Sequence, residues 1–231
     1  MTAFSYVDEN LAAIRARINA ARERADGREV TLLAAVKYTD TDHIKYLHSL
    51  GVNDIGENRV QQLLEHWEAL ERENLRVHFI GTLQKNKVKY IIDKVSMIHS
   101  LDSLSLAQEI EKQAAKHGIV MDVLVEINSG MEENKSGVSP DGAAALCKEI
   151  AQFSHLNLRG FMTMAPKCEK NDEYRKYFRK TSQLCLDIWQ KTLHNIGRPI
   201  LSMGMSDSFE VAIEEGADIV RVGRALFVQH E

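Results

Sequence analysis

The stretch LLAAVK, residues 32–37, consists of five apolar residues closed by a lysine, and Tyr38-Thr39-Asp40 follows as a turn. An apolar run this short, bounded by turn residues, predicts a strand buried on both faces, as in a parallel sheet. Lys37 then stands at the carboxyl end of the strand, where parallel α/β proteins place their chemistry. Apolar walls would disfavour its ammonium form and leave an amine able to attack an aldehyde. On this stretch alone, a lysine that merely reaches past the sheet into solvent is an equally good explanation.

The unit of apolar run, turn and amphipathic segment recurs along the chain. Alternation of strands and helices indicates a parallel sheet. Eight such units favour a closed (β/α)₈ TIM barrel over an open doubly wound sheet. The predicted strands are residues 30–37, 54–57, 77–81, 97–101, 121–128, 156–164, 200–204 and 218–223.

A long amphipathic helix is predicted ahead of the first strand. Apolar residues recur at alternating spacings of four and three from Val7 to Ala25, which places them on one stripe of a helix over residues 5–25. We therefore expect residues 1–231 to form a single barrel domain, with residues 1–26 packed outside the barrel or against a partner chain. We expect a monomer. The sequence itself does not report the oligomeric state.

Helix-terminal residues support this division. Ser139 followed by Pro140 is typical of an N-cap and a first helical position, and Asp207 with Glu210 resembles a capping box. Four glycines each follow a predicted helix, where a left-handed residue is favoured. They are Gly51, Gly118, Gly197 and Gly216.

The composition argues against nucleic-acid binding and against a membrane or secreted protein. With 231 residues and a formal net charge of −4, the chain has no excess of positive charge for nucleic acid. The cluster Lys85, Lys87 and Lys89 is explained by a solvated helix face. No apolar run approaches the ~18 residues of a membrane span, and the N-terminus does not resemble a signal peptide.

Cysteine and histidine usage points to a cytoplasmic protein without a metal site. Cys147, Cys168 and Cys185 are odd in number and far apart, so we expect reduced thiols. The nine histidines show no metal-ligand spacing, and no metal is predicted.

The last two predicted strands end in an arrangement suited to an anion. Ser206 follows strand seven at an expected helix N-terminus, and Gly223-Arg224 ends strand eight, where barrels often bind phosphate. By alternation Arg221 points the same way as Gly223, towards the mouth, where its partner is Glu126, Asp102 or a ligand. A lysine for an aldehyde and a phosphate site suggest a phosphorylated carbonyl compound. Pyridoxal 5′-phosphate (PLP) and the sugar phosphates of aldolases both fit.

Several longer motifs resemble the YggS/PROSC-type pyridoxal phosphate homeostasis proteins, which share the barrel of the alanine racemase N-terminal domain. The motifs occur in the order of that family and span most of the chain. They are AAVKY (34–38), GENRVQ (56–61), HFIGTLQKNKVK (78–89), SLDSLSLA (100–107), NSGMEENKSG (128–137), RGFMTMAP (159–166), LSMGMSDS (201–208) and VRVGRALF (220–227).

The resemblance implies a role for individual residues. Lys37 matches the lysine that holds PLP as a Schiff base, and Arg221 matches the arginine that faces the pyridine nitrogen, where a cation makes the ring a poorer electron sink. Lys135 lies in a loop that could reach the mouth, although a solvated loop lysine is the more ordinary explanation. Arg224 stands where many members have threonine. The remaining residues implied to line the cofactor or its phosphate are Asn58, Met203, Met205, Ser206, Gly223 and Arg224.

Such a site is compatible with three functions. Racemisation needs two bases on opposite faces of the substrate, and the sequence places only Lys37 with confidence. We therefore expect a non-catalytic protein that buffers PLP or delivers it, with PLP-dependent apoenzymes as possible partners. The alternatives are a slow PLP-dependent amino-acid racemase and a Schiff-base aldolase.

Overall fold

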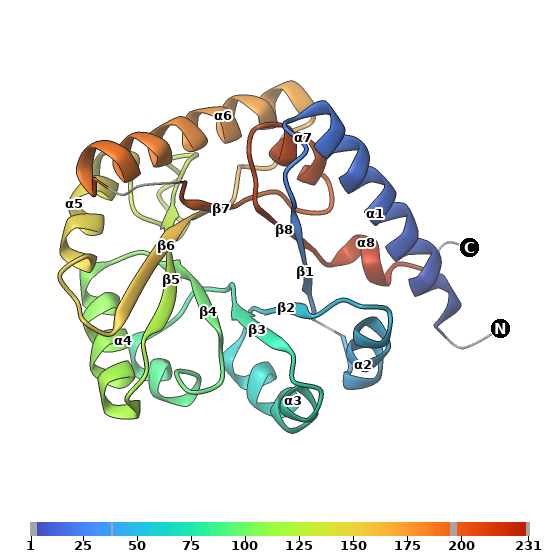
Figure 1. Cartoon of the computed structure of the whole chain (residues 1–231), viewed down its shortest axis with the longest axis horizontal. Helices are drawn as coiled ribbons and strands as arrows, with labels where there is room; N and C mark the ends of the chain where they lie inside the picture. Colours follow the sequence, from blue (N-terminus) through green and yellow to red (C-terminus); the bar gives the residue numbers. More distant parts are fainter. Residues whose placement is uncertain (1–3, 38, 195–197, 230–231) are drawn as a thin grey trace.

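The computed structural model of the chain describes residues 4–37, 39–194 and 198–229. Its centre is a closed barrel of eight parallel strands in chain order, seen end-on in Figure 1. The predicted (β/α)₈ fold is confirmed, with each strand at its predicted place. The strands are β1 (Thr31–Ala35), β2 (Asp54–Glu57), β3 (Arg76–Phe79), β4 (Met97–Leu101), β5 (Met121–Ile127), β6 (Leu156–Thr163), β7 (Ile200–Ser202) and β8 (Ile219–Val222).

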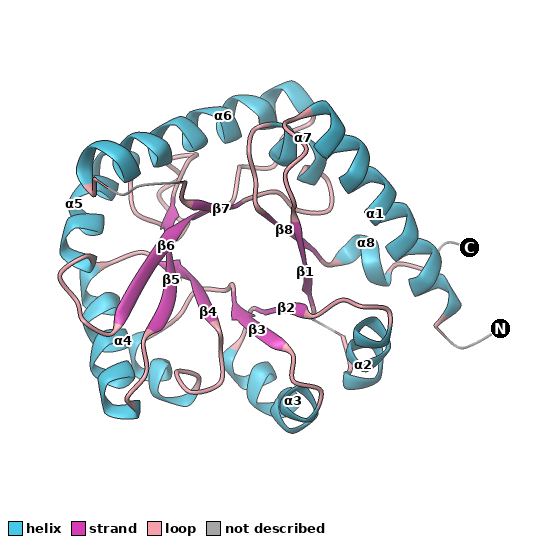
Figure 2. Cartoon of the chain, viewed as in Figure 1, coloured by secondary structure: helices cyan, strands magenta, loops and turns pink. Residues whose placement is uncertain are grey.

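Helices surround this barrel (Figure 2). Between β3 and β4 the connection is a single 3₁₀-helix, η1 (Lys85–Tyr90), which exposes the side chains of Lys85, Lys87 and Lys89 as expected for a solvated face. A π-helical turn, η2 (Ile188–Thr192), extends the sixth helix. The α-helices are α1 (Ser5–Arg24), α2 (Thr41–Ser49), α3 (Val60–Arg72), α4 (Leu104–His117), α5 (Pro140–Ile150), α6 (Asn171–Asp187), α7 (Phe209–Glu214) and α8 (Arg224–Phe227).

Alternation along β1 separates the two layers of the core. Ala34 and Val36 belong to the large cluster between the sheet and the helices, whereas Leu33 and Ala35 belong to a small cluster with Ile80 and Ile219. Because successive side chains of a strand point to opposite faces, this small cluster lies inside the barrel. The barrel closes where β1 pairs with β8, with Leu33 opposite Arg221.

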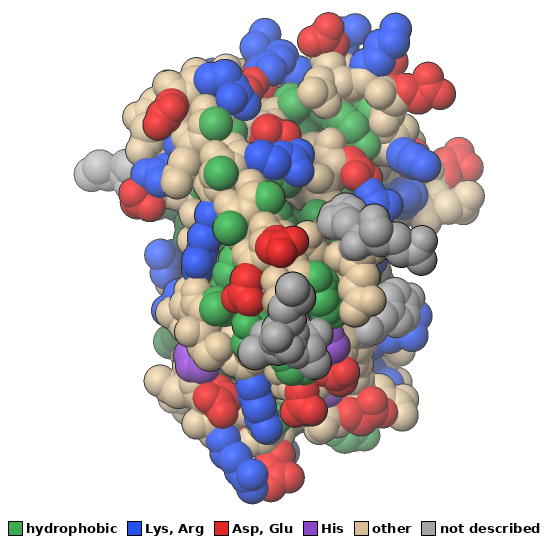
Figure 3. All heavy atoms as spheres, turned by 90° about the vertical axis from the view of Figure 1, so that its right-hand side faces the viewer, with side chains coloured by type: hydrophobic (Ala, Val, Ile, Leu, Met, Phe, Trp, Pro, Cys, Tyr) green, Lys and Arg blue, Asp and Glu red, His purple; other side chains and the backbone are tan. Residues whose placement is uncertain are grey.

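The N-terminal helix packs on the outside, as predicted. α1 lies against α7 and α8 (Figure 1), with Val7, Leu11 and Ile14 buried. Asn10 Nδ2 donates to the carbonyl oxygens of Leu226 (3.1 Å) and Val228 (2.8 Å), which ties α1 to the end of the chain. On this side of the molecule basic and acidic side chains are intermixed (Figure 3).

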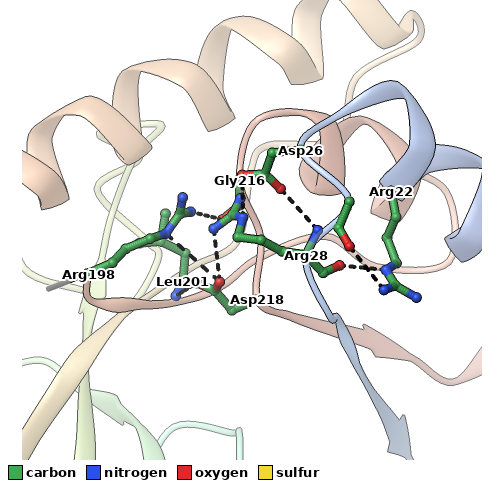
Figure 4. Close-up of polar contacts among 8 residues, drawn as sticks. Arg22, Asp26, Arg28, Arg198, Leu201, Gly216 and Asp218 are labelled. Carbon is green, nitrogen blue, oxygen red and sulfur yellow. Dashed lines mark hydrogen bonds and ion pairs between the residues drawn. The ribbon is translucent and has the colours of Figure 1, made fainter.

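A polar cluster fastens the amino-terminal end of the barrel (Figure 4). The Asp218 carboxylate accepts from the amide of Leu201 (2.8 Å) and from Arg28 (3.2 Å), and Arg22 of α1 donates to the carbonyl of Arg28. Burial raises the pKa of Asp218 above its usual range, although these donors oppose the shift. In barrels this end serves stability rather than chemistry.

Most predicted helix ends are confirmed. Ser139 Oγ accepts from the amide of Gly142 (3.2 Å) and Pro140 is the first residue of α5. Three of the four glycines have the left-handed φ predicted for them, and Gly197 lies outside the described residues. Their φ angles are +80° at Gly51, +65° at Gly118 and +102° at Gly216.

The predicted capping box at Asp207 and Glu210 is wrong. α7 begins at Phe209 with Ser208 as its N-cap, and no side chain caps it. Asp207 instead forms an ion pair with Arg224, and Glu210 accepts from Arg17 of α1 (2.7 Å). Each of the two carboxylates thus pairs with an arginine outside α7 and does not cap that helix.

Three further findings concern only the described residues. No helix among them is long and apolar enough to cross a membrane. Among the same residues no three histidine, cysteine or acidic side chains gather as metal ligands. Cys147, Cys168 and Cys185 are free thiols, and burial raises the pKa of Cys147 to about 12.

Candidate functional site

A cavity of about 650 Å³ opens at the carboxyl ends of the strands. Its volume is in the range of small-molecule sites. Apolar side chains such as Ile80 and Met164 share its walls with charged ones. Seven of the eight residues expected to contact the cofactor or its phosphate line it together: Lys37, Asn58, Met205, Ser206, Arg221, Gly223 and Arg224.

Lys37 follows β1 and its side chain is exposed within the mouth. It lines both the main cavity and a neighbouring one of about 350 Å³ that also contains Asn58 and Glu126. The predicted position at the strand end is therefore confirmed, but the predicted enclosure by apolar walls is wrong. The mouth is wide, and the amine stays in contact with water.

Asn58 brings an unsatisfied acceptor to the same place. It follows β2, and its Oδ1 atom is buried without a hydrogen-bond partner among the described residues. A buried unpaired amide oxygen costs about 1–3 kcal/mol, which a donor on a bound molecule would offset. The loop after β3 passes close to the backbone of Asn58, since a Cβ at Gly81 would lie 2.0 Å from the Asn58 carbonyl oxygen.

Ser206, Gly223 and Arg224 meet where the loops after β7 and β8 approach each other. Ser206 Oγ accepts from the amide of Ala225 at 3.3 Å, so it sits beside the start of α8. The expectation that Ser206 lies at the N-terminus of α7 is wrong, because that helix begins three residues later. Gly223 is required by a close approach, since a Cβ there would lie 2.8 Å from the carbonyl oxygen of Ala35.

Arg221 is buried and points into the barrel mouth, as alternation predicted. Its Nη1 donates to Ser202 O and Ser202 Oγ, both at 2.7 Å, and its Nη2 donates to Thr163 O at 2.9 Å. Neither of the carboxylates suggested by the sequence is its hydrogen-bond partner. Burial lowers the pKa of Arg221 to about 10, while the charge of Glu126 opposes the shift, so the guanidinium remains a cation at neutral pH.

Glu126 is the nearby acidic group of the mouth. Burial raises the pKa of this carboxyl, and the charge of Asp102 adds to the shift, while a hydrogen bond from Ser136 (2.9 Å) and the charge of Arg221 oppose it. The mouth therefore combines an exposed amine, a buried cation and a buried carboxyl.

The prediction for Met203 is wrong. Met203 is 1 % exposed and belongs to the large cluster between sheet and helices. Since Ser202 points into the barrel, its neighbour Met203 must point out. Met205, the other methionine implied by the resemblance, lines the cavity together with Met164, and both are exposed.

Lys135 lies beside the site rather than in it. Its Nζ atom is 3.8 Å from Glu132, and the side chain is 61 % exposed. It lines an adjacent cavity of about 320 Å³ with Lys167 and Tyr174. This position agrees with the more ordinary explanation, a solvated loop lysine.

Sequence reasoning missed the polar residues inside the barrel. His78, His99 and Ser202 are buried there and connect Asp54 with Arg221. A signal was present, because His78 shares the inward parity of Ile80 on its strand.

Comparison with known proteins agrees with this geometry. The family model "Alanine racemase, N-terminal domain" matches residues 10–231. A pyridoxal phosphate homeostasis protein of Aquifex aeolicus is 45 % identical over 221 residues, which are 95 % of this chain and 96 % of the relative. The chain belongs to the pyridoxal phosphate homeostasis protein family. The family's member from Pseudomonas aeruginosa is 36 % identical over 225 residues, covering 96 % of this chain and 95 % of that protein.

Solved structures extend the comparison. PipY of Synechococcus elongatus with PLP bound matches with a TM-score of 0.84 and 27 % identity, covering 96 % of this chain and all of PipY. An alanine racemase of Clostridium difficile has a TM-score of 0.76 at 18 % identity, and the match covers 98 % of this chain but 57 % of the racemase. At that identity the likeness shows the barrel fold alone.

Proposed function

We propose that this protein binds PLP at the barrel mouth and acts in PLP homeostasis by holding the cofactor reversibly. The observation that carries the proposal is the meeting of Lys37, Arg221 and Ser206 on one cavity. These residues come from the loop after β1, from β8 and from the loop after β7, and each supplies a different part of a PLP site. We take residues 1–231 as one PLP-binding domain.

The residues present fit the cofactor. PLP carries an aldehyde that reacts reversibly with a primary amine, and Lys37 supplies that amine as a Schiff-base partner. Ser206 and Arg224 offer a hydroxyl and a cation to the phosphate. The unpaired Oδ1 of Asn58 can accept a hydrogen bond from the ligand. Ile80 and Met164 provide apolar contact for the pyridine ring.

Arg221 favours reversible binding of PLP over catalytic turnover of a PLP–substrate adduct. Its charged guanidinium disfavours a protonated pyridine nitrogen, which weakens the ring as an electron sink for bond cleavage at Cα. Because Lys37 is exposed, an amine dissolved in the surrounding water can reach it and compete with it for the PLP aldehyde. Both features favour reversible holding and release over catalysis.

The test is a spectroscopic titration with PLP. The parent protein is expected to develop the visible absorption of a lysine–PLP adduct, and Lys37→Ala is expected to lose it. Lys135→Ala is the matched control, since Lys135 lies in the neighbouring cavity. Deuterium exchange at Cα across a panel of amino acids in D₂O separates holding from racemisation. Sustained exchange that depends on Lys37 would contradict the carrier function.

PLP-dependent apoenzymes are the proposed recipients of the cofactor, because an incoming enzyme lysine can displace Lys37 by the same amine chemistry. We propose that the protein acts as a monomer in the cytoplasm. Sedimentation at several concentrations tests the first point, and cell fractionation tests the second.

A further inference from the structure

A chain of hydrogen bonds runs through the barrel from its amino-terminal end to Arg221. Asp54 Oδ1 lies 3.1 Å from His78 Nε2, and His78 Nδ1 lies 2.9 Å from His99 Nε2. His99 Nδ1 lies 3.0 Å from Ser202 Oγ, which accepts from Arg221. His99 and Ser202 are fully buried, and the other three residues are at most 8 % exposed.

The direction of every bond in this chain follows from its two ends. Ser202 Oγ already accepts from the guanidinium of Arg221, so its own proton is free to be donated to His99 Nδ1. His99 then carries its proton on Nε2 and donates to His78 Nδ1. His78 in turn donates from Nε2 to the Asp54 carboxylate. Each polar atom of the chain is satisfied with both imidazoles neutral.

The opposite direction fails at both ends. If His99 donated from Nδ1, Ser202 would accept twice, and its proton would have no acceptor among the described residues. His78 would then present a lone pair to the Asp54 carboxylate, unless it became a cation. Chains of bonds in a low-dielectric interior strengthen one another when complete and are costly when one bond is missing.

The charges around the chain favour the same state. Burial alone would raise the pKa of Asp54, but hydrogen bonds from His78 and Arg76 outweigh it and lower the pKa to about 2. Burial lowers the pKa of His99 well below its usual range, and the positive charge of Arg221 lowers it further. Asp54 is thus an anion and His99 a neutral acceptor, so no second cation forms beside Arg221.

We propose that His99 and Ser202, supported by His78 and Asp54, are positioning residues for Arg221. Their hydrogen bonds fix the direction in which the guanidinium faces the mouth. This inference rests on the proposed function, because it assigns to the chain the task of presenting Arg221 to the PLP ring. The positioning itself exists in the protein without PLP and can be measured there.

The first test uses the PLP-free protein. Long-range ¹H–¹⁵N NMR spectra are expected to show both His78 and His99 protonated on Nε2 only. The guanidinium protons of Arg221 are expected to exchange slowly with water. A proton on Nδ1 of either histidine overturns the proposed direction.

The second test compares two buried serines. Ser202→Ala removes the link between His99 and Arg221 while both remain, and PLP affinity is expected to fall roughly 10-fold, with faster exchange of the Arg221 protons. Ser100→Ala is the matched control, because Ser100 is 1 % exposed on β4 and its hydroxyl has no partner among the described residues. The control is expected to stay within about 2-fold of the parent.

Substitutions at His99 provide rescue. His99→Leu is expected to behave like Ser202→Ala, whereas His99→Gln, which offers an acceptor and a donor, is expected to recover most of the affinity. If His99→Leu does not fold, the comparison of Ser202→Ala with Ser100→Ala still tests the proposal. Equal PLP affinity and equal Arg221 exchange in Ser202→Ala and Ser100→Ala would overturn the proposal. Failure of the parent to bind PLP would remove the proposed function, while the tautomers and the Arg221 exchange would still test the positioning.

Discussion

Lys37 and Arg221 line one cavity from adjacent strands, because β1 and β8 pair to close the barrel. The register places Leu33 opposite Arg221, so the backbone of Lys37, four residues further on, lies nearer the mouth than that of Arg221. The cavity thus joins an exposed lysine to a buried cation. This arrangement suits a flat cofactor held at its aldehyde by Lys37, with its ring nitrogen towards Arg221.

The contribution of Ser206 should depend on the phosphate of the ligand. Ser206→Ala removes a hydroxyl beside the start of α8 and is expected to weaken PLP binding roughly 10-fold, the effect of one hydrogen bond to a charged group. Binding of pyridoxal, which lacks the phosphate, is expected to change by less than about 2-fold. Titration of parent and variant with both ligands makes the comparison. An equal loss for both would mean that Ser206 does not contact the phosphate.

Arg224 is expected to contribute less than Ser206. Its side chain is 71 % exposed and already pairs with Asp207, so Arg224→Ala should weaken PLP binding only about 2- to 5-fold, and less at high salt. Asp207→Asn releases the guanidinium and is expected to strengthen binding by a similar factor. Affinities of both variants at low and high salt check this. Weaker binding by Asp207→Asn would show that the ion pair itself positions Arg224.

Gly81 should matter to both stability and binding. A Cβ at this position would lie 2.0 Å from the Asn58 carbonyl oxygen, so Gly81→Ala must displace the loop that carries Asn58. We expect a loss of about 1–3 kcal/mol in the free energy of unfolding and weaker PLP binding. Gly118→Ala is the control, since it has open space around it and only a left-handed φ to disturb. It should cost about 1 kcal/mol and leave PLP binding unchanged.

Asp54 should stabilise the fold in a pH-dependent way. Its pKa falls from the ordinary 3.8 to about 2 in the folded protein. Because the folded-state pKa is the lower one, the stabilisation is present above about pH 4 and is lost as the pH falls towards 2. Asp54→Asn should therefore lower the free energy of unfolding by about 2 kcal/mol at pH 7 and by much less near pH 2.

Denaturant titrations across that range measure the effect. Asp122→Asn provides the control, because Asp122 is the second residue of β5 and pairs with the partly exposed Arg159. Its loss is expected to cost about 0.5 kcal/mol or less. A difference between parent and Asp54→Asn that does not shrink in acid would contradict the ion pairing assigned to Asp54.

The strands were predictable because buried parallel strands leave short apolar runs between turn residues, as in Leu32–Val36. Their order also placed Lys37, Ser206 and Arg221 at one end of a barrel, which brought them together. Met203 was misplaced because the parity of β7 is fixed only by the inward contacts of Ser202. The pairing of Asp207 with Arg224 joins two loops and leaves no pattern along the chain.

The polar chain inside the barrel was beyond sequence reasoning for the same reason. His99 and Ser202 are far apart in sequence and meet only because both side chains point into the interior of the closed barrel, from β4 and β7. The exposure of Lys37 was equally hidden, since the width of the mouth depends on loops whose paths the sequence does not specify.

The most direct measurement is borohydride reduction of the protein mixed with PLP, followed by peptide mass mapping. The account predicts a pyridoxyl group on Lys37, with Lys135 and Lys167 unmodified at stoichiometric PLP. A pyridoxyl group on either of those lysines with Lys37 unmodified, or no adduct at all, would contradict it.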